Sequence, residues 1–246
     1  MILRDISFPT AEENILFDEI LLDLAERQEA GEALRFWEAQ QTFVVLGKIG
    51  KPAQDLHEVA IRQEGIPVLR RSSGGGTVVQ GKGCLNYTLI LSKDRPQMAT
   101  IHRSYQFILN KIVEALKDLN IQAVFKPICD IATSDGEKKF SGNAQRRGKK
   151  FILHHGTILY DFNLDLIERY LRMPKDFPEY RHNRRHLDFV TNIPVSPQKA
   201  REVIKKAFEV TGENNTLKPR ETEILLRLRQ KRITSAGTEE VSQSNF

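Results

Sequence analysis

Residues 70–86 read Arg70-Arg71-Ser72-Ser73-Gly74-Gly75-Gly76-Thr77-Val78-Val79-Gln80-Gly81-Lys82-Gly83-Cys84-Leu85-Asn86, so that two arginines run into three consecutive glycines between two apolar runs. Three glycines in succession lose much conformational entropy on folding, and a ligand that needs close approach to the backbone is a natural compensation. The adjacent arginines indicate that this ligand is anionic. The stretch therefore predicts an anion-binding loop around which the other elements are arranged.

This glycine loop does not follow the familiar nucleotide-binding patterns. It contains neither GxGxxG nor GxxxxGK[ST], and it connects an expected strand at 67–70 to another at 85–91 rather than to a helix. A glycine hairpin with solvated arginines is the alternative interpretation of the loop alone. The function must therefore be decided by the loop in combination with other residues.

The composition is that of a soluble globular protein, with 40% apolar and 28% charged residues in 246. No apolar run approaches the roughly 20 residues that a membrane-spanning helix requires. The first residues do not resemble a signal peptide, because acidic residues follow at once. We therefore expect a cytoplasmic protein with no membrane contact.

The net charge of +5 suggests attraction to an acidic protein or a phosphate-bearing substrate. Nucleic-acid binding is not expected, because no basic segment is interleaved with aromatic residues in a recognisable motif. The two cysteines, Cys84 and Cys129, have no CxxC spacing and are expected to be free thiols, with Cys84 in a packing role. A monomer is the simplest expectation.

Hydrophobic periodicity and turn residues predict alternating helices and strands. Helices are expected at 11–30, 54–64, 100–120, 163–171, 196–210 and 220–230, and strands at 34–37, 42–47, 67–70, 85–91, 121–126, 138–144 and 151–161. The segment 174–195 is expected to be an irregular surface loop or a lid.

A second group of chemistry-bearing residues lies downstream, at Cys129-Asp130, at 138–145 and at 154–157. Lys139 stands beside the small residues Ser141 and Gly142, which leave room for a ligand against the strand backbone. A solvated surface lysine is the alternative. His154 and His155 alternate on a strand, so that one imidazole is expected to face in and one out, and no third ligand suggests a metal site.

Together these motifs resemble the lipoate–protein ligase and octanoyltransferase family. The motifs are Arg70-Arg71-Xaa-Ser73-Gly74-Gly75-Gly76-Xaa-Val78 with Leu85-Asn86, Lys139-Xaa-Ser141-Gly142-Asn143-Ala144, and His155-Gly156-Thr157. The resemblance extends to Glu13-Asn14, Asp18-Glu19, Arg35-Phe36-Trp37 and Val45-Leu46-Gly47, and covers approximately residues 1–195.

The resemblance implies an α/β fold of the α+β type, with mixed β-sheets flanked by helices, as in biotin and lipoate protein ligase catalytic domains. We expect a catalytic domain at 1–195, a short C-terminal helical extension of the same domain at 196–232 and a disordered tail at 233–246. The larger ligases add a C-terminal accessory domain. Only about 50 residues follow Pro194 here, so that no full accessory domain is expected and an accessory subunit could be a separate chain.

In the ligases, ATP activates lipoate or octanoate as an acyl-adenylate, and a lysine of a small acceptor domain then attacks. The resemblance therefore implies ATP and Mg²⁺ with lipoate as substrates, an apolar acyl tunnel beside the loop, and a lipoyl-acceptor domain of 2-oxoacid dehydrogenase or glycine cleavage proteins as partner. Biotin is an alternative acid, because biotin ligases share the fold. Which acid is preferred stays open.

The resemblance also assigns residues. Backbone amides at Gly74–Gly76 and the charge of Arg70 would bind the anion, and Lys139 would contact the acyl carbonyl and phosphate. The other acyl or adenylate contacts are Arg71, Ser73, Val78, Asn86, Asp130, Ser141, Gly142, Asn143, Ala144, His155, Gly156 and Thr157. No metal ligand is fixed, because the acidic or His-Asp pair that many ligases carry after the loop is here Gln80-Gly81-Lys82-Gly83.

Cys129 supports a competing hypothesis. It stands where ligases often have asparagine, about ten residues before Lys139, and some octanoyltransferases of this fold carry their nucleophilic cysteine in this region. A thiolate there could take an octanoyl group from acyl carrier protein without ATP or another cofactor. The intact triple glycine and the ligase-like Lys139 motif favour the ligase. An inert buried Cys129 is the third interpretation, and a non-catalytic acyl- or acceptor-binding module, or one subunit of a two-chain ligase, is the second alternative function.

Overall fold

The computed structural model of the protein describes residues 1–230. Its helices are α1 (Ala11–Glu26), α2 (Pro52–Asp55), α3 (Glu58–Gln63), α4 (Ile101–Lys117), α5 (Asp165–Tyr170), α6 (His186–Phe189) and α7 (Pro197–Ala207), with 3-10 turns η1 (Pro96–Met98) and η2 (Glu179–Arg181). A last helix begins at residue 219 and continues to the end of the described region. The mixed α/β class with helices flanking mixed sheets is confirmed.

The strands form a large and a small sheet. They are β1 (Ile2–Asp5), β2 (Ala33–Trp37), β3 (Phe43–Leu46), β4 (Val68–Arg70), β5 (Val78–Gln80), β6 (Cys84–Ser92), β7 (Ala123–Lys126), β8 (Asp130–Thr133), β9 (Lys139–Arg147), β10 (Phe151–Leu159) and β11 (Gly212–Glu213). The eight-stranded sheet has the order β11-β1-β2-β6-β10-β9-β8-β7, and the three-stranded sheet has the order β4-β3-β5.

The register of β6, β10 and β9 decides which residues share a face of the large sheet, because successive side chains point to opposite sides of a strand. Thr88 of β6 lies opposite His155 of β10, which lies opposite Ala144 of β9. These three therefore share one face. Their neighbours Tyr87 and His154 point to the other.

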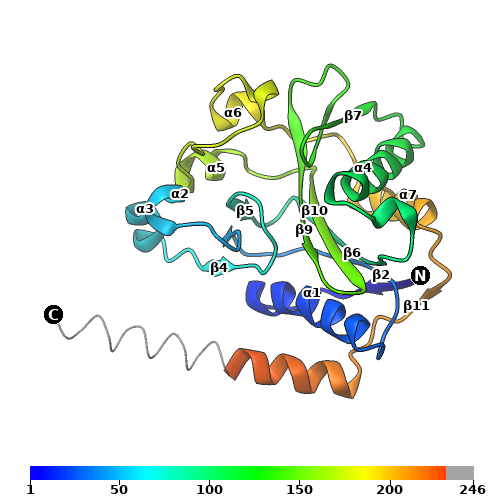
Figure 1. Cartoon of the computed structure of the whole chain (residues 1–246). Helices are drawn as coiled ribbons and strands as arrows, with labels where there is room; N and C mark the ends of the chain where they lie inside the picture. Colours follow the sequence, from blue (N-terminus) through cyan, green and yellow to red (C-terminus); the bar gives the residue numbers. More distant parts are fainter. Residues whose placement is uncertain (231–246) are drawn as a thin grey trace.

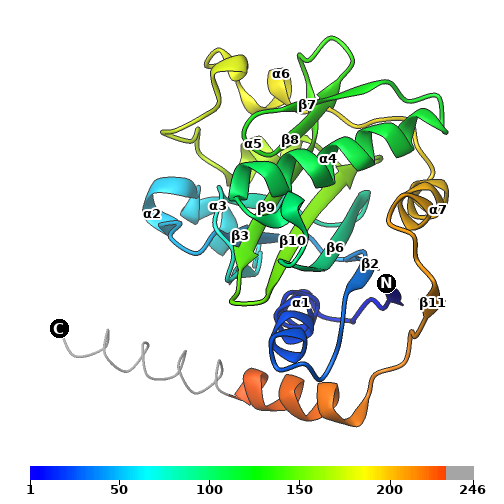
Figure 2. The same ribbon diagram turned by 45° about the vertical axis from the view of Figure 1, so that its right-hand side comes forward.

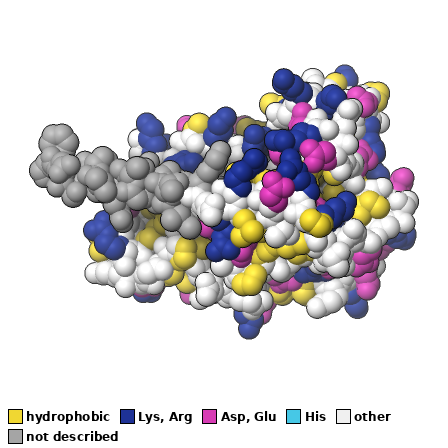
Figure 3. Space-filling view, turned by 90° about the horizontal axis from the view of Figure 1, so that it is seen from below, with side chains coloured by type: hydrophobic (Ala, Val, Ile, Leu, Met, Phe, Trp, Pro, Cys, Tyr) yellow, Lys and Arg dark blue, Asp and Glu magenta, His cyan; other side chains and the backbone are white. Residues whose placement is uncertain are grey.

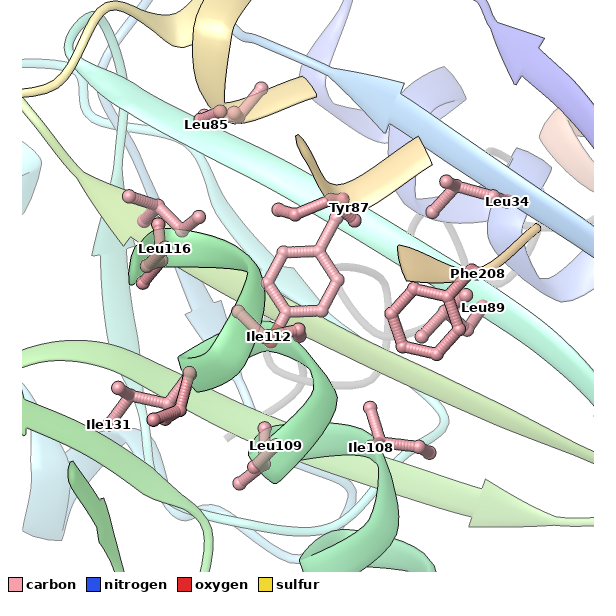
Figure 4. Close-up of a cluster of buried hydrophobic side chains, with 14 of the residues drawn as sticks. Leu34, Leu85, Tyr87, Leu89, Ile108, Leu109, Ile112, Leu116, Ile131 and Phe208 are labelled. Carbon is pink, nitrogen blue, oxygen red and sulfur yellow. The ribbon is translucent and has the colours of Figure 1, made fainter. Parts of the chain in front are cut away.

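One face of the large sheet packs against α4, the amphipathic helix expected at 100–120. Thr100 caps this helix by accepting a hydrogen bond from the Arg103 amide, 3.2 Å away. Its apolar side, with Ile108, Leu109 and Ile112, lies against the sheet residues Leu34, Tyr87 and Leu89 (Figure 4). α7 packs on α4 and completes this core.

The opposite face is covered by α1 and joined by the small sheet. Ile20, Leu21 and Leu24 of α1 pack with Ile90 and Leu153 of the large sheet. Trp37 of β2 packs with side chains of β3. α4 and α1 therefore enclose the large sheet from its two sides (Figures 1 and 2).

The helix that starts at residue 219 lies along α1 (Figure 1). Its Ile224 and Leu225 are buried in the cluster that α1 makes with the sheet. A buried ion pair of 2.7 Å joins Glu221 to Arg4 of β1. The helical extension thus packs on the same body, although the domain boundaries stay predictions and residues 231–232 lie outside the described part.

Several sequence-based boundaries are wrong for local reasons. The first helix stops at Glu26 rather than at residue 30, because Gln28 adopts a φ of 62° and the amides of Glu29 and Ala30 turn back to the Leu24 carbonyl. The 54–64 helix is two short helices, α2 and α3.

The glycine loop leads into β5 and not directly into β6, since β5 pairs with β3. The short strands β1, β5, β8 and β11 are not predicted from periodicity. The 174–195 segment is irregular apart from η2 and α6. The tail predicted to be disordered, 233–246, lies outside the described residues.

The described helices include none that is both long and apolar enough to cross a membrane. Seen from below, the surface carries Lys and Arg side chains interspersed with acidic and apolar ones (Figure 3). The basic character of the sequence is therefore not a uniform stripe on this face.

Replacing Ile112 by alanine should destabilise the protein by about 2–5 kcal/mol, because it removes a fully buried side chain at the centre of the α4 interface. Ile101→Ala is the matched control in the same helix, where the side chain is 56% exposed, and should change stability by less than about 0.5 kcal/mol. Urea unfolding curves measure both. Equal shifts of the two midpoints would contradict this packing.

Candidate active site

The Arg71 guanidinium lies inside the glycine loop and fixes its conformation. Nη2 donates to the carbonyls of Gly74 (2.6 Å) and Gly76 (2.8 Å), and Nε donates to Ser73 Oγ (3.0 Å). Burial lowers the pKa of Arg71 to about 10, so that it stays cationic at neutral pH. Arg71 therefore acts in this structure as the inner support of the loop.

The orientation of the loop carbonyls has a consequence for its amides. Because a carbonyl and the N–H of the following residue point in opposite directions across a trans peptide, the Gly74 and Gly76 carbonyls that face Arg71 turn the N–H groups of Gly75 and Thr77 away from it. Within residues 1–230, the amides of Gly74, Gly75 and Gly76 have no hydrogen-bond acceptor. Successive unpaired amides of this kind form a concavity that suits an anion.

The loop also comes unusually close to its neighbour strand. Gly75 has a φ of 85°, and its carbonyl oxygen would overlap with a Cβ at position 47. Only glycine fits there, as Gly47. Arg70 binds the carbonyls of Gly47 and Gly50, at 2.8 Å each, so that it braces the adjoining turn.

Two carboxylates of α1 lie near the loop, one contacting it directly and one facing His155. Glu19 Oε1 accepts from the Ser72 amide at 3.1 Å. The preceding carboxylate, Asp18, pairs with buried Arg35 at 2.6 Å and faces His155 Nδ1 at 3.6 Å. Burial raises the pKa of Asp18, but the attraction of Arg35 and the contact with His155 outweigh it and hold the pKa below its usual value.

His155 connects α1 to the loop. Its Nε2 is 2.6 Å from Ser73 Oγ, which places the loop over the face that carries Thr88, His155 and Ala144. A Cβ at Gly75 would touch Ala144 at 3.7 Å. The loop is thus seated on β10 and β9.

The Lys139 ammonium reaches the same face of β9, at a point where the pairing of β9 with β8 shifts register. It pairs with Asp130 at 2.7 Å and lies 2.9 Å from the position of a Cβ at Gly142. Burial alone lowers the pKa of Lys139, but Asp130 outweighs it and raises the pKa. Tyr180 donates to the other oxygen of Asp130 at 2.7 Å.

The ammonium and the glycine loop flank one short strip of β9. Lys139 covers Gly142 and the loop covers Ala144, two residues along. Two residues of a strand span about 7 Å. The unpaired amides and the cation are therefore close enough to bind opposite ends of one small anionic group.

Cys129 adjoins this cation but is not activated. Its Sγ is 3.9 Å from Asp130 Oδ1, and the residue is partly buried. Burial first, and then the charge of Asp130, raise the pKa of the Cys129 thiol to about 11 despite Lys139. The thiol is therefore protonated at neutral pH.

Three residues assigned to the site by resemblance lie on the face covered by α4. Asn143 donates to Ser141 Oγ at 3.2 Å and to the Cys129 carbonyl at 2.8 Å, and accepts from Tyr87. A Cβ at Gly156 would collide with Asn143. The structure does not bring Ser141, Asn143 and Gly156 to the face of the glycine loop, and their roles stay predictions.

The remaining assigned residues are distributed around the loop. Asn86 and Thr157 are register partners on the face of His155, and Val78 is the first residue of β5. His154 is fully buried against α4, where burial lowers its pKa to about 3. The two histidines alternate as expected, but neither points freely into solvent.

The sequence-based assignment of site residues omitted the supports of the site, Asp18, Glu19, Arg35 and Tyr180. The signal for Asp18 was a charged residue among apolar ones in α1, where ten residues are buried. Tyr180 gave no signal, because it lies in an irregular segment.

Two open grooves of the described surface lie away from the loop. One, of about 800 Å³, runs between α4 and α7, and one of about 490 Å³ lies between α3 and α5. Neither is lined by loop residues, and the acyl tunnel stays a prediction.

A model of the lipoyl protein ligase A/B catalytic domain matches residues 10–209. The chain belongs to this family. Octanoyltransferase LipM of Geobacillus kaustophilus is 27% identical over 84% of this chain and 84% of its own. Lipoate-protein ligase LplJ of Bacillus subtilis is 30% identical over 62% of this chain and 44% of its own.

Solved structures show the same fold. The bi-partite lipoate protein ligase of Thermoplasma acidophilum superposes with a TM-score of 0.80 over 94% of this chain and 92% of that one, at 22% identity. A lipoate-protein ligase A bound with ATP gives a TM-score of 0.75 over 94% of each chain, at 21% identity. The chain is therefore an enzyme of the ligase and octanoyltransferase family, while the comparisons leave its reaction open.

Gly47→Ala should lower turnover by about tenfold or more, because its Cβ would displace the Gly75 carbonyl and with it the unpaired amides. Gly31→Ala, at a position with nothing within 4 Å, is the control and should leave turnover within about twofold. Steady-state rates of acyl transfer to an acceptor domain check this. Normal activity of the first variant would show that the approach of Gly75 to Gly47 is dispensable.

Alkylation of Cys129 by iodoacetamide should accelerate about 100-fold between pH 7 and pH 9, because with a pKa of about 11 the reactive thiolate fraction grows tenfold per pH unit. A thiol activated to a pKa near 7 would gain only about twofold over the same range. Peptide mapping by mass spectrometry separates Cys129 from buried Cys84. A flat profile would contradict the protonated thiol.

Proposed function

We propose that the protein is an ATP-dependent lipoate–protein ligase that activates lipoate or octanoate as an acyl-adenylate and transfers the acyl group to a lysine of a lipoyl-acceptor domain. The observation that carries this proposal is the pairing of three unpaired loop amides with the Lys139 ammonium across one strip of β9. This arrangement suits a phosphate joined to an acyl group, because each end is anionic or becomes so during transfer.

The residues fit the activation step as follows. The carboxylate oxygen of the acid attacks the α-phosphorus of ATP, and pyrophosphate leaves. The amides of Gly74–Gly76 would hold phosphate oxygens, and Lys139 would neutralise the charge shared between the acyl carbonyl and the phosphate. Asp130 and Tyr180 keep the Lys139 ammonium in place.

Mg²⁺ carried by ATP would neutralise phosphate charge. Residues 1–230 offer no group of three or more His, Cys, Asp or Glu side chains that could hold a metal ion. We therefore propose that any Mg²⁺ enters with the nucleotide, as Mg²⁺ commonly does.

In the transfer step, the amine of the acceptor lysine attacks the acyl carbonyl and AMP leaves. The loop amides and Lys139 would stabilise the negative charge that develops on the oxygens. The acceptor is proposed by analogy with the lipoylation system of Thermoplasma acidophilum, which pairs its ligase with an E2 lipoyl domain. An accessory subunit is proposed on the same basis, because that ligase is bi-partite.

An octanoyltransferase is the second candidate, favoured by the LipM match over 84% of both chains. In that reaction the Cys129 thiolate would attack an octanoyl thioester, release the carrier thiol and pass the octanoyl group to the acceptor lysine. The raised pKa of Cys129 speaks against it, because the thiolate is scarce at neutral pH.

The deciding experiment incubates the protein with an apo lipoyl domain and either lipoate plus Mg-ATP or octanoyl carrier protein. For a ligase, Cys129→Ala keeps ATP-dependent modification within about threefold, and Lys139→Ala lowers it by about 100-fold or more because the charge on the acyl-phosphate is no longer neutralised. Intact-mass spectrometry of the acceptor measures the product.

Lys138→Ala is the matched control, since this neighbouring lysine is exposed and is not paired with Asp130. Transfer from octanoyl carrier protein that disappears in Cys129→Ala would instead establish the transferase. Modification by neither donor, with acceptor binding retained, would indicate a non-catalytic module, unless activity appears when an accessory subunit is added.

A further inference from the structure

A line of side chains from three elements runs from β2 to the glycine loop. Arg35 of β2 binds Asp18 of α1, Asp18 faces His155 of β10, and His155 contacts Ser73 of the loop. Arg35, Asp18 and Ser73 are at most 3% exposed. Burying two charges is costly, so that the arrangement calls for an explanation beyond simple packing.

The ion pair with Arg35 does not by itself account for the buried carboxylate of Asp18. The Arg35 guanidinium also donates to the carbonyls of Ile6 and Asn14 and to the Asn14 side chain, at 2.7–3.1 Å. Asp18 Oδ1 receives one Arg35 donor at 2.6 Å. The second oxygen, Oδ2, accepts from Thr88 at 2.8 Å and is the atom that faces His155.

The charge of Asp18 determines which His155 nitrogen carries hydrogen. An ionised carboxylate only accepts hydrogen bonds, so that a bare Nδ1 lone pair 3.6 Å from Oδ2 would be repelled. A hydrogen on Nδ1 is attracted. Neutral His155 therefore has its hydrogen on Nδ1 and an acceptor lone pair on Nε2.

The hydrogen bonds of Ser73 agree with this tautomer. Ser73 Oγ already accepts from Arg71 Nε at 3.0 Å. Its own hydroxyl hydrogen is therefore available for His155 Nε2, 2.6 Å away. The direction is consistent along the line, with Ser73 donating to His155 and His155 directed at Asp18.

We propose that Asp18 is a positioning residue, which fixes His155 as the Nδ1–H tautomer and through Ser73 holds the glycine loop in the conformation that presents its amides. Glu19, the next residue of α1, supports the same loop at Ser72. The effect of Asp18 on the rate of acyl-adenylate formation rests on the proposed ligase function. The assignment of the His155 tautomer does not depend on that function.

The first test is long-range ¹H–¹⁵N NMR of the histidine rings at pH 8, with the His155 signals assigned from a His155→Gln variant. The expected result is the neutral Nδ1–H tautomer in the substrate-free protein. An Nε2–H tautomer or an imidazolium would overturn the proposal. This measurement needs no altered Asp18 and no substrate.

Asp18→Asn should reverse the tautomer. Because Arg35 requires an acceptor, the amide oxygen of the introduced side chain takes the place of Oδ1, and its amide nitrogen then donates toward Nδ1. His155 must carry its hydrogen on Nε2. Asp23→Asn, in the same helix with a side chain that is 43% exposed, is the control and should leave the His155 tautomer unchanged.

The second test measures adenylate formation by pyrophosphate exchange. Asp18→Asn and Ser73→Ala should each slow exchange by about tenfold or more, and the double variant should be no slower than the slower single variant, because both break one line. Multiplying effects would show that Asp18 acts independently of Ser73. If Asp18→Asn does not fold, the His155 tautomer of the wild-type protein still decides whether the proposal holds.

The two tests separate this inference from the proposed function. No exchange in the wild type or any variant, even with an accessory subunit added, together with the Nδ1–H tautomer, would refute the ligase and leave the positioning of Ser73 standing. Active exchange with the Nε2–H tautomer would support the ligase and refute the positioning role of Asp18.

Discussion

The hydrogen bonds from Arg71 into the glycine loop are the interaction on which the site depends. A loop of three glycines has many accessible backbone conformations, and a buried cation that binds two of its carbonyls selects one in which the amides turn outward. The charge of Arg71 is therefore used to orient peptide dipoles, whereas the Lys139 ammonium pairs with Asp130 beside the loop. The two basic groups have different tasks although both belong to motifs of the same family.

The sheet supplies the second constraint. Side chains of a regular strand alternate, so that the register of β6, β10 and the part of β9 from Gly142 onward sends His155, Ala144 and Gly142 to the loop and sends Asn143 and Gly156 to α4. Gly156 leaves the space that Asn143 and Tyr87 fill. Residues that are adjacent in one motif thus lie on opposite faces, some beside the glycine loop and some on the side covered by α4.

Much of this organisation could be predicted from the sequence, because long amphipathic helices such as α4 and long apolar strands such as β6 have strong periodic signals. The glycine loop and Lys139 were found through their motifs. Asp18 and Tyr180 are not assigned roles from the sequence, because a charged residue in the apolar side of α1 does not show which residue it contacts, and Tyr180 lies in an irregular segment. The inward direction of Arg71 was equally hidden, because sequence gives the charge of an arginine but not whether it meets a ligand or its own backbone.

The helix beginning at residue 219 has a consequence for how the protein is made. Glu221 binds Arg4 across 217 positions of sequence, and the same helix covers α1. During synthesis α1 emerges among the first elements and its outer face stays uncovered until nearly the whole described chain has left the ribosome. The helix whose carboxylates support the glycine loop is therefore closed on its outer side only by the last helix of the described chain.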